Sequence, residues 1–149
     1  MSHKGQCRFF ETTAPSRLKE KRRLGAFVLQ LLHDYTRQYA CLSYTFIDDE
    51  ALLDLNRRFL QHDYYTDILT FDLSEKGSGL ITGDIYISLE RVKDNARQLQ
   101  VRYQDELLRV ILHGALHLAG FKDKKPTDEK NMRLLETQWM QRFQNELPD

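Results

Sequence analysis

YQDELLRVILHGALHLAGFKD, residues 103–123, is the stretch that decides the fold. Apolar residues cover most of the circumference of a helix drawn through residues 103–119. A helix that is apolar nearly all round belongs in the core of a protein, so we expect this one to be buried. Its apolar positions are Leu107, Leu108, Val110, Ile111, Leu112, Ala115, Leu116 and Leu118.

One polar stripe interrupts this apolar surface. Its members follow one another at i+3 and i+4 spacing, which places them on one face of the helix. They are Arg102, Glu106, Arg109, His113 and His117. The helix is therefore expected to present a single polar edge that ends in two imidazoles one turn apart.

The two histidines have the spacing of metal ligands. Side chains at i and i+4 can reach one zinc ion, which histidine binds at about 2.0–2.1 Å. Gly120 stands where a helix commonly ends in a left-handed residue, after which the chain can return and bring Asp123 to the same point. The pattern predicts one zinc ion per chain, held by His113, His117 and Asp123, with a fourth position left open as catalytic sites require. The alternative is that each histidine is an ordinary core or surface residue.

The residue after the first histidine excludes the most familiar use of such a site. Zinc peptidases of the H-E-x-x-H type have a glutamate there, which acts as the general base. This chain has Gly114 at that position. We therefore expect zinc chemistry other than peptide hydrolysis.

Outward from this helix, the chain alternates between strand and helix patterns. Apolar residues at helical spacing predict helices at about residues 16–35, 49–59, 89–99, 103–119 and 128–145, with Asp48 as an N-cap. Alternating or short apolar runs predict strands at residues 6–11, 41–47, 67–73 and 80–88. The order is not a strict strand–helix alternation. We expect an α+β fold, in which about five helices pack on a mixed sheet of about four strands.

Composition is that of an ordinary globular domain. The chain has 149 residues, of which 41% are hydrophobic and 30% charged, and its formal net charge is zero. These values predict one domain over residues 1–149. The sequence opens without an apolar leader, contains no run long enough to span a bilayer, and has only Cys7 and Cys41, without CxxC spacing. We expect a cytoplasmic protein that does not bind membranes.

Basic residues gather in RLKEKRR, residues 17–23. Two interpretations stay open for this segment: a surface that faces phosphates, or the solvated first turns of a helix.

Three segments together resemble a known family. Residues 113–123 resemble H-G-x-L-H-L-x-G-[Y/F]-D-H, residues 55–71 resemble L-N-x-x-Y-R…D-x-P-T-D-V-L-S-F, and GDIYIS at residues 83–88 matches G-D-I-x-I-S. These are motifs of the YbeY-type rRNA maturation factors, which are small bacterial metal-dependent endoribonucleases. The resemblance covers about residues 52–136 in the expected order.

The resemblance implies a function. It implies a single zinc ion, cleavage of single-stranded ribosomal RNA in the maturation of the 3′ end of 16S rRNA, and late quality control of ribosomes, with the small subunit as partner. Two positions depart from the family pattern: Asp123 stands where the third ligand is usually histidine, and Leu60 stands where an arginine associated with cleavage is typical. Leu60 favours an alternative, a ribosome-assembly factor with a structural zinc and weak or no nuclease activity.

The acid and base of the reaction are left unassigned by the sequence. Asp67 and Asp84 flank expected strand ends, where a cap or a turn is the ordinary role of an aspartate.

Overall fold

Four strands form one mixed sheet in the computed structural model, which describes residues 5–146. The spatial order is β1-β2-β4-β3. Both β1 and β4 run parallel to β2, and β3 pairs antiparallel with β4 at one edge. The strands are β1 (Gln6–Phe10), β2 (Tyr39–Ile47), β3 (Ile68–Asp72) and β4 (Leu80–Ser88).

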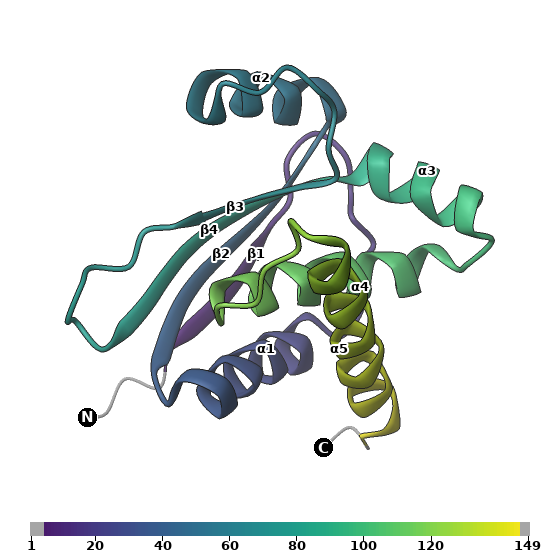
Figure 1. Ribbon diagram of the computed structural model, residues 1–149. Helices are drawn as coiled ribbons and strands as arrows, with labels where there is room; N and C mark the ends of the chain where they lie inside the picture. The colour runs from purple at the N-terminus through teal and green to yellow at the C-terminus, as the bar shows by residue number, and fades with distance from the viewer. Residues whose placement is uncertain (1–4, 147–149) are drawn as a thin grey trace.

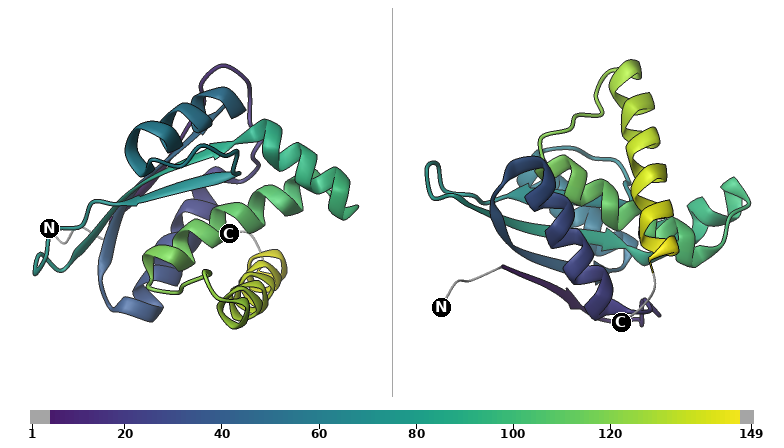
Figure 2. Two further views of the ribbon diagram at one scale, coloured as in Figure 1. Left: turned by 45° about the horizontal axis from the view of Figure 1, so that its top comes forward. Right: turned by 90° about the horizontal axis from the view of Figure 1, so that it is seen from below.

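Helices cover both faces of the sheet (Figure 1). They are α1 (Lys21–Thr36), α2 (Asp49–Leu60), α3 (Leu89–Leu99), α4 (Tyr103–Leu118) and α5 (Pro126–Asn145). Helices α1 and α4 lie against one face and α2 lies over the other, while α5 packs across α4 (Figure 2). The predicted α+β architecture is therefore confirmed.

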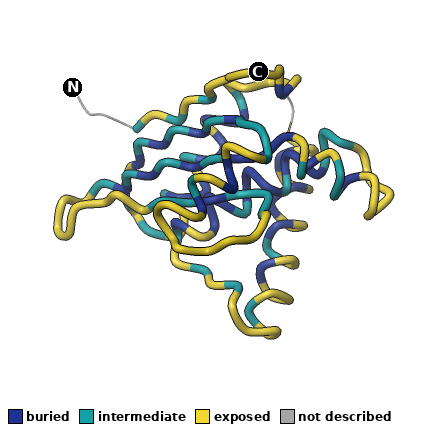
Figure 3. Tube along the Cα trace, turned by 90° about the horizontal axis from the view of Figure 1, so that it is seen from above, coloured by how far each residue is buried: buried dark blue, intermediate teal, exposed yellow. Residues whose placement is uncertain are grey.

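The main core lies between the sheet and the α1–α4 layer. Alternation along β2 buries Leu42, Tyr44 and Phe46, as the sequence pattern predicts, and α4 is buried along most of its length. Buried residues gather in the middle of the molecule (Figure 3). The hydroxyl of Tyr44 is fully buried and donates a hydrogen bond to the carbonyl of Ile111, 2.8 Å away. This bond fixes α4 against the middle of the sheet.

The first helix begins later than predicted, at Lys21 instead of about Ser16. The Ser16 backbone N–H and hydroxyl both donate to the carboxylate of Glu11, which holds this segment in a loop. Arg17 and Glu20 have φ angles of 59° and 57°, which are incompatible with a continuous helix.

The basic segment 17–23 is therefore split between a loop and the first turn of α1. Arg23 lies over the ring of Phe143 at 3.7 Å and donates to the Phe143 carbonyl, which gives this arginine a packing role. Across the described chain, no helix combines the length and the apolar character needed to cross a membrane.

Candidate active site

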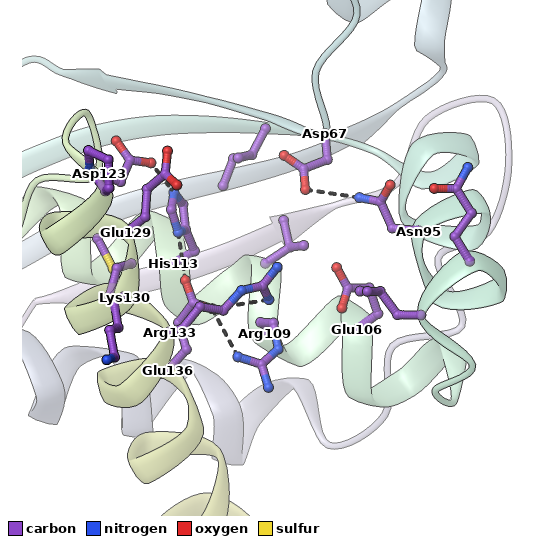
Figure 4. Close-up of a pocket in the computed structure, with 16 residues that line it drawn as sticks. Asp67, Asn95, Glu106, Arg109, His113, Asp123, Glu129, Lys130, Arg133 and Glu136 are labelled. Carbon is purple, nitrogen blue, oxygen red and sulfur yellow. Dashed lines mark hydrogen bonds and ion pairs between the residues drawn. The ribbon is translucent and has the colours of Figure 1, made fainter.

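A polar cleft of about 670 Å³ lies where α4, α5, α3 and the start of β3 meet (Figure 4). Most of the side chains that line the cleft are charged or polar, and the others are apolar. The charged and polar ones are Asp67, Asn95, Gln98, Glu106, Arg109, His113, Asp123, Glu129, Lys130, Arg133 and Glu136. The volume is within the range typical of small-molecule sites.

The polar stripe of α4 supplies the floor of the cleft. Glu106, Arg109 and His113 all line it, at successive turns of a helix whose other faces are buried. Arg102 precedes the helix as its N-cap, and His117 lies one turn beyond His113, where it is exposed.

Both ring nitrogens of His113 face carboxylates. Nδ1 lies 2.7 Å from Oε2 of Glu136, and Nε2 lies 3.2 Å from Oδ2 of Asp123. Burial lowers the pKa of His113, but the hydrogen bond and charge of Glu136, with Asp123 and Asp67, outweigh this and leave the pKa above its ordinary value. The ring is held in one orientation, with its two nitrogens in different surroundings.

A tight turn after α4 delivers Asp123 to this place. Gly120 has a φ of 107°, the Phe121 N–H donates to the Leu116 carbonyl at 3.1 Å, and the Gly120 N–H donates to the His117 carbonyl at 3.0 Å. This pair of bonds is the Schellman motif, which ends a helix and reverses the chain. The prediction that Gly120 is left-handed and that the chain returns toward His113 is confirmed.

Two of the three predicted ligands are thus brought together. His113 and Asp123 are in contact, whereas His117 is exposed on the next turn. Within residues 5–146, no three His, Cys, Asp or Glu side chains are grouped closely enough to hold a metal ion. The metal site of His113, His117 and Asp123 therefore stays a prediction.

Glu136 is a site residue that the sequence reasoning missed. It is only 3% exposed, and its carboxylate accepts a hydrogen bond from Nη1 of Arg109 at 3.0 Å while it binds His113. The sequence pattern could have indicated its role, because Glu136 falls on the apolar face of α5 that also buries Met132 and Trp139. An acidic residue at a buried helical position needs a partner, and here the partners are on α4.

Glu136→Ala should lower the free energy of unfolding by about 2 kcal/mol, measured by urea denaturation. The change leaves Arg109 and His113 without their shared acceptor. A fully buried pair would lose more, but the Arg109 guanidinium can turn toward water in the cleft. Glu129→Ala, an exposed change on the same helix, is the control and should stay within about 0.5 kcal/mol. Equal stability of the two variants would contradict the network.

Asp67 directly precedes β3, as expected, but Asp84 lies in the middle of β4 and the prediction that it flanks a strand end is wrong. Asp67 lines the cleft, where its Oδ2 accepts a hydrogen bond from Nδ2 of Asn95 at 3.2 Å and burial raises its pKa. Asp84 lies between Gly83 and Ile85, which are buried on the α4 side of the sheet, so its side chain is on the opposite face. Only Asp67 therefore belongs to this site.

Leu60 ends α2 on the far side of the sheet and is 41% exposed. It does not line the cleft.

Gly114 lies where α4 approaches the sheet closely. A Cβ atom there would lie 3.0 Å from Cδ1 of Ile68 and 3.4 Å from Cγ2 of Ile85. A glutamate has no room at this position, which gives a physical reason for the absence of the peptidase base.

The family model described as "Endoribonuclease YbeY" matches residues 11–144. The chain belongs to the YbeY endoribonuclease family. This confirms the resemblance seen in the sequence and supports a nuclease hydrolase.

Relatives in this family align over most of the chain. Endoribonuclease YbeY of Porphyromonas gingivalis is 48% identical over 116 residues, which are 78% of this chain and 76% of the relative. That of Cytophaga hutchinsonii is 44% identical over 128 residues, or 86% and 89% of the two chains. The solution structure of TM1509 from Thermotoga maritima has a TM-score of 0.58 and 25% identity, and covers 92% of this chain and 88% of its own.

Proposed function

We propose that the chain is a zinc-dependent endoribonuclease that cuts single-stranded RNA, in maturation of the 3′ end of 16S rRNA and in late quality control of ribosomes. The small ribosomal subunit is its proposed partner. The main support for zinc-dependent chemistry is the position of His113 between Asp123 and Glu136 inside the cleft. Membership of an endoribonuclease family supports RNA as the substrate.

His113 and Asp123 are spaced as two ligands of one zinc ion would be. Two ligands of a tetrahedral zinc ion lie about 3.3 Å apart, and Nε2 of His113 is 3.2 Å from Oδ2 of Asp123. The bond from Nδ1 to Glu136 is the outer contact that zinc-bound histidines usually make, and it leaves Nε2 for the metal. His117, one turn along the same helix, is the proposed third ligand. Zinc bound there would act as a Lewis acid toward a phosphate ester.

The other cleft residues suit an RNA backbone. Lys130 and Arg133 are exposed on α5 and line the cleft, so they offer positive charge to phosphates. Arg109 is held by Glu136 at the cleft floor. Single-stranded RNA fits such a site better than duplex because its backbone can bend and its bases are free.

The alternative is a ribosome-assembly factor whose zinc is structural. The observation that favours it is Leu60, an exposed leucine on the far side of the sheet where the family pattern has an arginine.

A cleavage assay separates the two functions. Protein purified without a histidine tag should hold close to one equivalent of zinc by elemental analysis, cut single-stranded RNA, spare duplex RNA, and lose cleavage on chelation. Zinc restored to the chelated sample should restore cleavage. An inert protein that still binds small ribosomal subunits would support the assembly factor, and a protein that takes up no zinc at neutral pH would contradict both.

A further inference from the structure

The end of the cleft away from Asp123 is built from acids and amides. Glu106 on α4 and Asp67 before β3 point toward each other across it, with Asn95 of α3 beside Asp67 (Figure 4). Burial raises the pKa of Glu106. The charges of Arg133 and Arg109 oppose this rise, and the charge of Asp67 adds to it. The proposed metal ligands do not include any of these residues.

Glu106 has an unmet hydrogen-bonding requirement. The residue is only 4% exposed, and among the described residues its Oε1 atom is buried without a hydrogen-bond partner. A buried carboxyl oxygen without a partner destabilises the fold, and such groups in native proteins call for a specific explanation. Because Glu106 lines the cleft, a ligand with hydrogen-bond donors is one that would satisfy its carboxyl group.

The amides at this end also present acceptors. Nδ2 of Asn95 donates to Asp67, and Nε2 of Gln98 donates to Asp94, each at 3.2 Å. Their carbonyl oxygens are left to accept. Two carboxyl groups also repel phosphate, so a nucleotide would enter with its phosphate toward Lys130, at the other end of the cleft (Figure 4), and an uncharged part toward Glu106.

We infer that this acidic end is a nucleobase subsite that prefers guanine, an inference that rests on the proposed action on RNA. Guanine presents two adjacent donors, N1–H and N2–H, on its Watson–Crick edge, and single-stranded RNA exposes that edge. Adenine and cytosine pair a donor with an acceptor there, and uracil has one donor between two acceptors. The aliphatic side chains of Ile68, Leu99 and Val110 line the cleft and supply apolar surface for the base.

Binding of the four nucleoside 5′-monophosphates tests the subsite without cleavage. The assay is calorimetric titration of the whole chain in the presence of a chelator. It is run at about pH 8, because burial raises the pKa of Glu106 and that of Asp67 and a higher pH favours their ionised forms. GMP should bind about tenfold more tightly than UMP. Glu106→Gln should reduce this ratio to near one, because its amide can turn a donor toward the guanine donors, and Asp67→Asn should reduce it partly.

Asp105→Asn is the matched control. Asp105 is the neighbouring acid, and it accepts a hydrogen bond from Gln144 instead of lining the cleft. This variant should keep the preference for GMP. Thermal unfolding midpoints establish that the variants are folded.

The outcomes separate this inference from the proposed function. Equal affinity for the four nucleotides, no binding of GMP at millimolar concentration, or an unchanged ratio in folded Glu106→Gln would overturn the subsite, even if RNA cleavage is observed. A GMP preference that Glu106→Gln removes would support it, even if no cleavage is found.

Discussion

His117→Ala should abolish zinc binding and RNA cleavage while leaving the stability of the metal-free protein unchanged. The side chain is exposed, so its removal should change the free energy of unfolding by less than about 0.5 kcal/mol. Outer contacts of metal ligands change affinity or activity by about 10–100-fold, and loss of a ligand itself should exceed the upper figure. Competition with a chromogenic chelator measures zinc affinity, and cleavage of a single-stranded oligonucleotide measures activity.

His62→Ala is the control for this experiment. His62 is also exposed, and it stacks on Tyr64 in the loop after α2, outside the cleft. It should bind zinc and cut RNA as the unchanged protein does. If His117 were an ordinary surface residue, the two alanine variants would behave alike, and the three-ligand site would be wrong.

Gly114→Glu should unfold the protein or destabilise it by about 4 kcal/mol or more, without giving peptidase activity. The Cβ atom of the new side chain would be in close contact with Ile68 and Ile85. The carboxylate would then be buried among apolar groups. Urea denaturation, with circular dichroism to follow helix content, measures the effect.

Gly114→Ala separates crowding from charge. Alanine gains about 1 kcal/mol of helix propensity over glycine, which should roughly offset the displacement of the flexible Ile68 side chain. We therefore expect stability within about 1 kcal/mol of the unchanged protein. A well-folded Gly114→Glu variant of similar stability would show that α4 does not lie as close to β3 and β4 as described.

Local patterns predicted most of the fold. The apolar circumference of residues 103–119, the alternation along residues 41–47 and the glycine at 120 each reflect short-range physics, and each corresponds to an observed element or turn. The start of α1 was predicted too early because its limit depends on Glu11, a residue that apolar periodicity does not take into account.

The sequence predicted only the part of the site that lies on α4 and in the turn after it. His113 and Asp123 could be placed together because a single turn connects them. The role of Glu136 and the inward position of Asp67 depend on how α5 and β3 pack against α4, and such long-range packing has no signature in a short stretch of sequence. Alternation along the predicted strand at residues 80–88 could have placed Asp84 on the face opposite Ile85, whereas no local pattern places Asp67 in the cleft.

The two carboxylates around His113 have one more consequence. Asp123 and Glu136 hold the ring at both nitrogens, so it has lost its freedom to rotate about the Cβ–Cγ bond before any ligand arrives. The entropy of ordering a side chain is ordinarily lost when a complex forms, and it weakens binding. Here the folded chain has already lost that entropy, so an incoming ion or substrate meets a preorganised imidazole.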